Sequence, residues 1–183
     1  VDQVIAAVSL SDSILTFALL ADTTQLTATV TDANGETIPS PSITWTTSND
    51  AVATVSSTGL VTSVADGSAT ITATSESATA TATVSVAQVA ATLSLSDSAL
   101  TFNSLADTTQ LTPTVTDANG QVIDGATVTW ATSTASVATV SSTGLVTSVD
   151  YGSATITATS GSLTATASVT VEVSASEVWA SIS

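Results

Sequence analysis

Hydrophobic and polar residues alternate with a period of two along most of the chain. In residues 25–31, leucine, alanine and valine alternate with threonines, and residues 68–74 and 79–86 repeat this arrangement. Successive side chains of a strand point to opposite faces, so the pattern indicates strands with one buried and one solvated face, as in antiparallel sheets. No apolar run follows the helical period of 3.6 residues, and the chain is therefore predicted to be all-β.

Turn-forming residues divide this pattern into short segments. Asn34 and Gly35 tolerate positive φ angles and predict a hairpin turn over residues 32–35. About seven short strands with a tryptophan in the third main strand are typical of an immunoglobulin-like (Ig-like) β-sandwich. The predicted strands of the first half are residues 4–10, 14–19, 24–31, 42–47, 52–55, 60–64, 68–75 and 78–86. The side chains predicted to face inward are Leu15, Phe17, Leu26, Val30, Trp45, Val55, Leu60, Val64, Ile71, Ala73, Ala82 and Val84.

The whole pattern occurs twice, at an offset of 85 residues. Residues 9–86 align with residues 94–171 without a gap, and 57 of the 78 positions are identical. Each strand should therefore recur in the second half. The main core candidates are three residues and their counterparts, Phe17 and Phe102, Trp45 and Trp130, and Ile71 and Ile156. We predict two tandem Ig-like antiparallel β-sandwiches arranged end to end, in domains 1–87 and 88–172, followed by a C-terminal tail, 173–183, as a candidate assembly strand.

Several segments of the first copy form one ordered series, which comprises residues 22–35, 43–50, 52–62 and 67–74. This series resembles the bacterial Ig-like domain, group 2, and the resemblance covers residues 4–86 and 89–171. It implies a non-enzymatic module of the kind found in bacterial surface adhesins, secreted enzymes, and phage tail or capsid proteins. The implied role is presentation, adhesion or assembly.

One position of the second copy departs from the first in a strand. Pro113 stands where the first copy has Ala28. Proline cannot donate a hydrogen bond to the sheet, so we expect this strand to lie at an edge or to be bulged there.

The composition excludes several classes of function. Lys, Arg, His, Cys and Met are absent, and 15 Asp and Glu residues give a formal net charge of −15. Without cationic side chains, the chain offers no counterion release on nucleic acid and no attraction to an anionic lipid surface. No apolar stretch is long enough to insert into a membrane. The lack of His and Cys excludes His-activated nucleophiles and ordinary zinc sites.

The ends of the copies are the candidate assembly surfaces. Residues 84–93 contain neither Gly nor Pro, which predicts a stiff join between the copies. Residues 172–183 have no counterpart upstream; this tail could be the stub of a third unit, dock on the second copy, or add as a strand to a neighbouring chain. The interface candidates are Val4, Val8, Val173, Val178, Trp179 and Ile182.

Two residue types offer candidate ligand sites. Trp45 and Trp130 could be ligand platforms, but a tryptophan at this place in an Ig-like sandwich normally packs in the core, as we predict here. Four aspartates are candidate Ca²⁺ ligands, namely Asp12, Asp22, Asp97 and Asp107. Their spacing, however, is unlike that of a calcium-binding loop. No other cofactor is predicted.

Threonines at alternating positions of three strands should share one outward sheet face. These are Thr44, Thr46, Thr70, Thr72, Thr74, Thr79, Thr81 and Thr83. Such a hydroxyl array could bind ice or a glycan, but sheet twist would spoil lattice matching, and a sheet with few charges needs hydroxyls for solubility. Since no acidic pair is set in an identifiable cleft, as glycoside hydrolysis would need, the chain is predicted not to be an enzyme.

Together these features predict a rigid, non-enzymatic extracellular protein that builds a cell-surface stalk or filament. It would self-associate by strand addition through its termini or pack against neighbouring Ig-like domains. The chain begins at Val1 without Met, which favours a secreted product whose signal sequence has been removed, or a trimmed fragment. The alternatives are a phage virion protein (a tail or capsid decoration), a ligand-binding adhesin, and a carrier module of a secreted enzyme.

Overall fold

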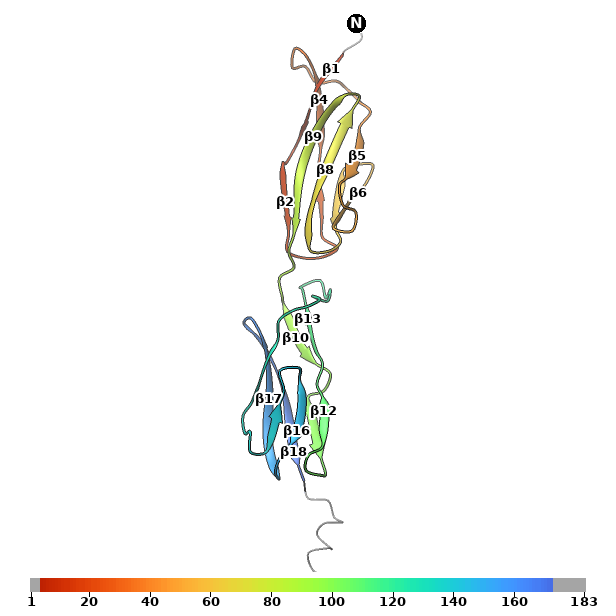
Figure 1. Ribbon diagram of the computed structural model, residues 1–183. Coiled ribbons are helices and arrows are strands. Elements are labelled where there is room, and N and C mark those ends of the chain that lie inside the picture. The colour runs from red at the N-terminus through yellow and green to blue at the C-terminus, as the bar shows by residue number, and fades with distance from the viewer. Residues whose placement is uncertain (1–3, 173–183) are drawn as a thin grey trace, which may run out of the picture. The chain divides into compact units, whose positions relative to one another are not determined.

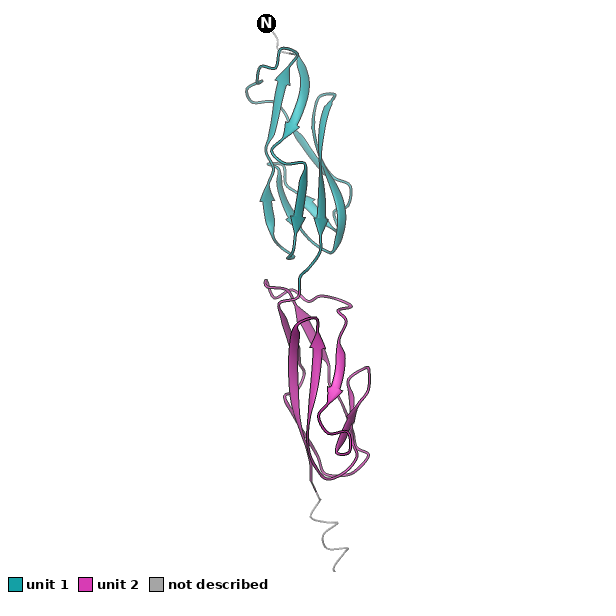
Figure 2. Ribbon diagram, turned by 90° about the vertical axis from the view of Figure 1, so that its left-hand side faces the viewer, with its two compact units in different colours: residues 1–89 teal, residues 90–183 magenta. Residues whose placement is uncertain are grey.

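The computed structural model describes residues 4–172 of the chain, and these residues form strands, turns and loops without a helix. The chain divides into two compact units, unit 1 (Val1–Val89) and unit 2 (Ala90–Ser183), coloured separately in Figure 2. Each unit is an Ig-like β-sandwich, which confirms the all-β class and the tandem duplication predicted from the sequence. The structure divides the chain two residues beyond the boundary expected from the repeat.

Unit 1 is built from short strands around one long hairpin, β8–β9 (Figure 1). The strands are β1 (Ile5–Leu10), β2 (Ile14–Phe17), β3 (Thr23–Gln25), β4 (Ala28–Asp32), β5 (Thr44–Thr47), β6 (Ala53–Val55), β7 (Leu60–Ser63), β8 (Gly67–Ser75) and β9 (Ala78–Val86). One sheet has the order β2-β9-β8-β5, a second has the order β3-β7-β6, and β1 pairs with β4.

Unit 2 repeats this topology. Its strands are β10 (Thr92–Leu95), β11 (Ala99–Phe102), β12 (Thr108–Gln110), β13 (Pro113–Thr116), β14 (Thr129–Thr132), β15 (Ala138–Val140), β16 (Leu145–Ser148), β17 (Gly152–Ser160) and β18 (Leu163–Val171). The sheets have the orders β11-β18-β17-β14 and β12-β16-β15, and β10 pairs with β13.

The sheets are mixed rather than wholly antiparallel, which corrects one detail of the predicted fold. β2 runs parallel to β9, with Leu15 opposite Val84, and β11 runs parallel to β18. The reason is that β1 and β2 are two parts of one N-terminal stretch. After residues 11–13, the chain leaves β4, the partner of β1, and continues alongside β9.

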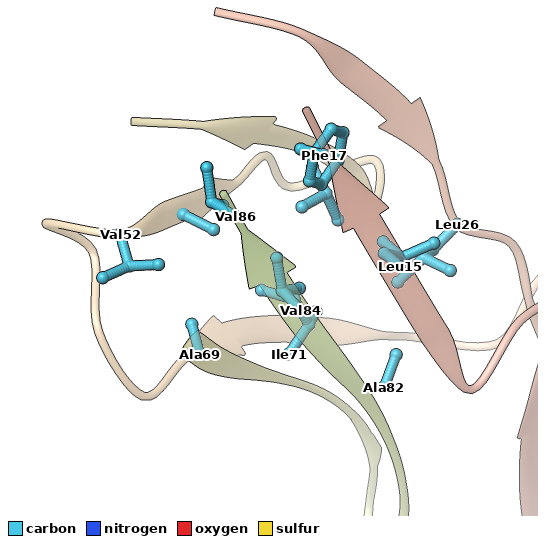
Figure 3. Close-up of a cluster of buried hydrophobic side chains, with 11 residues drawn as sticks. Leu15, Phe17, Leu26, Val52, Ala69, Ile71, Ala82, Val84 and Val86 are labelled. Carbon is cyan, nitrogen blue, oxygen red and sulfur yellow. The ribbon is translucent and has the colours of Figure 1, made fainter. Parts of the chain in front are cut away.

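The core of each unit lies between its sheets. Side chains from β2, β8 and β9 form this core together with Leu26 and Val52, as Figure 3 shows for unit 1. Burial of each large aliphatic or phenyl side chain stabilises the fold by about 1.5–3 kcal/mol. The buried cluster of unit 1 contains Leu15, Phe17, Leu26, Val52, Ala53, Val61, Ala69, Ile71, Ala82, Val84 and Val86. That of unit 2 contains Leu100, Phe102, Leu111, Ala138, Val146, Ala154, Ile156, Ala167, Val169 and Val171.

The predicted inward face of β7 was wrong. Leu60 and Val64 are 38% and 42% exposed, whereas Val61 and Ser63 are buried. The reason is a hydrogen-bonding site for the Ser63 hydroxyl, which donates to the Leu19 carbonyl at 2.8 Å and accepts from the Asp22 N–H at 3.0 Å. These bonds hold Ser63 inside, and strand geometry then turns its neighbours outward.

The strand predicted at residues 24–31 is two strands in different sheets. β3 pairs with β7, β4 pairs with β1, and the break falls at Leu26 and Thr27. At the break the Leu26 N–H donates to the Gly59 carbonyl, and Thr27 accepts from the Ser11 N–H, so each backbone group turns to a different sheet. In unit 2, β10 is the strand that pairs with β13, and one isolated bridge joins Thr116 to Val122 on the other side, so Pro113 lies at a sheet edge, as expected.

Candidate functional site

A groove lies beside the indole ring of Trp45 in unit 1. Its volume is about 340 Å³, and its walls come from the break between β3 and β4, the segment leading into β5, and the loop between β6 and β7. The lining residues are Leu26, Thr27, Ala28, Pro41, Ile43, Trp45, Ser57 and Thr58. Segments far apart in sequence thus meet around one aromatic side chain.

A glycine and a glutamine fix the position of the Trp45 ring and its wall. Gly59 has a φ of +86°, and a Cβ atom there would lie 2.8 Å from Cζ2 of Trp45 and 2.5 Å from the Leu26 carbonyl oxygen. The Gln25 side-chain amide donates to the carbonyls of Leu26 and Thr58, at 2.7 Å each. The ring therefore packs directly on backbone, and the loop carrying Thr58 is tied to the strand break.

The groove combines apolar surface with uncharged polar groups. Trp45 is half-buried and packs with one side against the core cluster. Within the described part of the chain its indole N–H has no protein acceptor, and because no buried side-chain N or O atom there lacks a partner, this N–H reaches solvent. The Ser57 hydroxyl is likewise unpaired there, whereas the Thr58 hydroxyl bonds with that of Ser56 at 2.9 Å. None of the lining residues is charged.

The corresponding part of unit 2 has a different shape. Gly144 packs under Trp130 as Gly59 does under Trp45. Pockets of about 200 and 250 Å³ lie in unit 2, and Trp130 lines neither of them. The pocket of about 200 Å³ is lined by Pro113, Thr114, Val115, Val122, Ile123, Asp124, Gly125, Ala126 and Val128. Proline and alanine are exchanged between two positions of the copies. Unit 1 has Pro41 and Ala28, whereas the matching positions of unit 2 have Ala126 and Pro113.

Both tryptophans were predicted to lie in the core, and no groove was predicted from the sequence. The structure places Phe17, Phe102, Ile71 and Ile156 in the buried clusters, while Trp45 and Trp130 lie half-buried at their margins. The paired exchange of proline and alanine between the copies is the signal that could have revealed the groove.

The candidate calcium ligands are not brought together. The Asp22 carboxylate accepts from the Thr23 N–H at 2.8 Å, and its backbone is bonded to Ser63, with Asp107 and Ser148 repeating the backbone part in unit 2. Asp12 and Asp97 are exposed between the first two strands of their units. Among residues 4–172 no three Asp or Glu side chains group as a metal would require.

The threonine face exists as predicted. Thr72 lies opposite Thr46 on one side and Thr81 on the other, and a second row joins Thr74 to its neighbours Thr44 and Thr79. These side chains are exposed or half-buried, opposite the buried alanines and Ile71. The outward face of β5, β8 and β9 thus carries rows of hydroxyls, whereas the exposed Ile14 lies beside Thr83 on the same face of β2.

The candidate interface residues lie at the two ends. Val4 is 74% exposed and Val8 is half-buried on β1. The other candidates, Val173, Val178, Trp179 and Ile182, fall outside the described residues. Nowhere in the described part is there a helix with the length and apolar character to cross a membrane.

The join between the copies is tied to both units by backbone hydrogen bonds. In unit 1, the N–H groups of Ala87 and Val89 donate to the carbonyls of Phe17 and Ala18, at 2.9 and 3.0 Å. Between them the Gln88 N–H donates to the Asp66 carboxylate at 2.8 Å. In unit 2, the Ala91 N–H donates to the Thr116 carbonyl at 2.8 Å, so a single residue, Ala90, separates the two anchored stretches.

Several solved structures are similar to this chain. A fragment of the S-layer protein SbsC, rSbsC(31-844), is 22% identical over 92% of this chain, with a TM-score of 0.45; the chain spans only 28% of that fragment. The Escherichia coli adhesin FdeC is 19% identical, with coverage of 93% of this chain and 66% of that one and a TM-score of 0.44. The C-terminal 282-residue fragment of intimin, in complex with the intimin-binding domain of its translocated receptor, is 18% identical, with coverage of 92% and 64% and a TM-score of 0.36.

The family comparison covers both units. No curated protein matches the sequence. The family model of the bacterial Ig-like domain (group 2) matches residues 5–86 and again residues 93–171, which together hold the described strands of both sandwiches. The chain therefore belongs to the bacterial Ig-like domain (group 2) family.

Proposed function

We propose that this chain is a non-enzymatic structural and adhesive segment of an extracellular protein, and that it serves in a cell-surface stalk or filament. The observation that carries the proposal is the occurrence of two consecutive domains of this family joined through one unanchored residue, Ala90. Such a segment works by shape and strength: each sandwich core resists unfolding, and the join transmits force from one core to the next.

The anchored join supports the mechanical part of the proposal. A flexible linker needs several residues free to sample different backbone conformations. Here the residues on both sides of Ala90 donate hydrogen bonds within their own units. We therefore expect the join to be stiffer than a free linker of the same length.

The side-chain chemistry supports a role without catalysis. The sequence contains no His or Lys to activate its many serines as nucleophiles, and no Cys. With neither Lys nor Arg, the chain also offers no cleavage site to trypsin-like proteases, which suits a surface exposed to the medium.

Immunogold electron microscopy of the source cells tests the location. Antibodies against the full chain should label extended structures outside the cell. Label confined to the cytoplasm would refute the proposal, and label on phage particles would favour the virion alternative instead.

Spin-label distance measurements test the stiff join. The chain has no native cysteine, so Thr81→Cys and Thr166→Cys, both on exposed strand positions, would label each unit once. We expect a narrow distance distribution between the labels. The control inserts two glycines after Ala90 and should broaden it. Equal widths in both proteins would show that the join is flexible without the insertion.

Assembly through the termini is the remaining part of the proposal. Strand addition by residues 173–183 predicts that deleting them abolishes filament formation by the full chain, as seen in negative-stain images. Filaments that persist unchanged after the deletion would exclude the tail as the assembly element.

A further inference from the structure

We propose that the groove beside Trp45 binds one hexose unit of a neutral glycan. This inference deepens the adhesive part of the proposed function by naming the chemical class of its ligand. It starts from the position of Trp45, whose partly exposed ring lines a groove of about 340 Å³ and whose N–H has no protein acceptor among the described residues. That volume falls at the lower end of the range for small-molecule sites, roughly 300–1,000 Å³.

The groove offers the combination of surfaces that a pyranose ring requires. A hexose has an apolar face of C–H groups and a rim of hydroxyls. The indole ring, with Pro41 and Ile43 beside it, provides a rigid apolar wall for the C–H face. The indole N–H is a donor, and the Ser57 hydroxyl can both donate and accept, so the sugar hydroxyls find partners that no protein group occupies.

Charge excludes acidic sugars as ligands. The chain has no Lys, Arg or His to pair with a carboxylate or sulfate, and its net charge of −15 repels anions. No residue lining the groove is charged, so an acidic sugar would lose hydration of its charge without a compensating partner. A neutral hexose meets neither obstacle.

Unit 2 provides a comparison within the same chain. Both pockets described above are smaller and neither is lined by Trp130, and Pro113 occupies the position of Ala28. Both positions face the same residue of the paired strand, since Leu10 lies opposite Ala28 and Leu95 opposite Pro113. Proline at this position is therefore compatible with the fold, and Ala28→Pro gives unit 1 one of the wall residues that differ in unit 2; the others are Ala126 and Val128 in place of Pro41 and Ile43.

A titration of the full chain followed by ¹H–¹⁵N NMR tests the inference. The indole N–H signals of Trp45, Trp130 and Trp179 are assigned with single Trp→Phe variants. The probes are cellotriose, maltotriose and mannotriose, with trigalacturonate as the acidic comparison. We expect at least one neutral trisaccharide to shift the Trp45 signal saturably, with a dissociation constant on the order of 1 mM, and to leave Trp130 in place.

Two variants complete the test. Ala28→Pro should weaken binding at least tenfold, and Ser57→Ala, which removes a hydroxyl without a protein partner, should weaken it about threefold while leaving the melting temperature unchanged. The inference is overturned if no neutral trisaccharide shifts Trp45 at about 20 mM, roughly twenty times the expected constant. It is also overturned if trigalacturonate binds as well as they do, or if both variants bind like the parent chain. A negative titration would overturn the glycan inference alone, because the immunogold experiment tests the proposed function separately.

Discussion

A methyl group added at Gly59 should destabilise unit 1 severely. Two effects combine there: alanine would have to adopt a φ of +86°, and its Cβ would lie 2.5 Å from the Leu26 carbonyl oxygen and 2.8 Å from Cζ2 of Trp45. The Leu26 carbonyl is backbone at the break between β3 and β4, where it also accepts from the Gln25 side-chain amide. The Trp45 ring packs against the core cluster, so moving either neighbour away would cost other contacts.

The size of the effect follows from these two contributions. The left-handed conformation costs a non-glycine residue about 1–2 kcal/mol. Overpacking at a rigid site adds about 1–3 kcal/mol. Gly59→Ala should therefore lower the free energy of unfolding of unit 1 by about 2–5 kcal/mol.

Gly35→Ala is the matched control. Its φ of +84° is nearly the same, but an added Cβ has no atom within 4 Å, so only the conformational cost of about 1–2 kcal/mol applies. Differential scanning calorimetry would measure both variants, with the transition of unit 2 as an internal reference. In a domain of this size, 1 kcal/mol shifts the melting temperature by about 4–8 °C, so the two variants are separable. Equal losses would refute the packing argument.

Three further outcomes are expected. Ser63→Ala leaves the part-buried Asp22 N–H and the Leu19 carbonyl without the Ser63 hydroxyl, so chemical denaturation should show unit 1 about 1–3 kcal/mol less stable. The exposed Ser57→Ala should change stability by less than about 0.5 kcal/mol, and similar values for both variants would contradict the role of the buried Ser63 hydroxyl. Glu76 has a φ of +52° where unit 2 carries Gly161, so Glu76→Gly should stabilise unit 1 by about 0.5–1 kcal/mol in the same assay, and a loss would show that the glutamate is not strained. EGTA and millimolar Ca²⁺ should give the same melting temperature, because the Asp22 carboxylate already accepts a backbone N–H; a Ca²⁺-dependent rise reversed by EGTA would restore the calcium hypothesis.

Strict alternation made the longest strands predictable. The expected segments 68–75 and 78–86 agree with β8 and β9 within one residue, because nine consecutive positions keep one face apolar and the turn between them interrupts the pattern. The same rule was ambiguous for residues 60–64, where apolar side chains occur on both faces. There the hydrogen bonds of Ser63 decide which face is buried, and its partners lie more than 40 residues away.

Contacts between residues far apart in the sequence also determine the strand break and the groove, which the sequence pattern did not predict. Alternation runs unbroken through Leu26 and Thr27, so nothing local shows that the chain changes sheets there. The groove depends on the same kind of information. Ala28, Pro41 and Ser57 meet at Trp45 only because the strand break, the segment before β5 and the loop after β6 converge in the folded unit. A tryptophan that fills a core and one that borders a groove are indistinguishable in the local pattern.

The differences between the two copies separate the framework from the variable surface. Of the 21 positions that differ, seven fall within residues 36–43 and their counterparts 121–128. This segment contributes Pro41 and Ile43 to the groove of unit 1 and most of the wall of the pocket of about 200 Å³ in unit 2. By contrast, the residues that lock the turns and the ring are identical in both copies, namely Asp22, Gln25, Gly59 and Ser63 with Asp107, Gln110, Gly144 and Ser148. Their hydrogen bonds and close packing recur at matching distances, so the framework is the same in both units. Since the framework does not depend on residues 36–43, the two units can keep one fold and present different surfaces to a ligand.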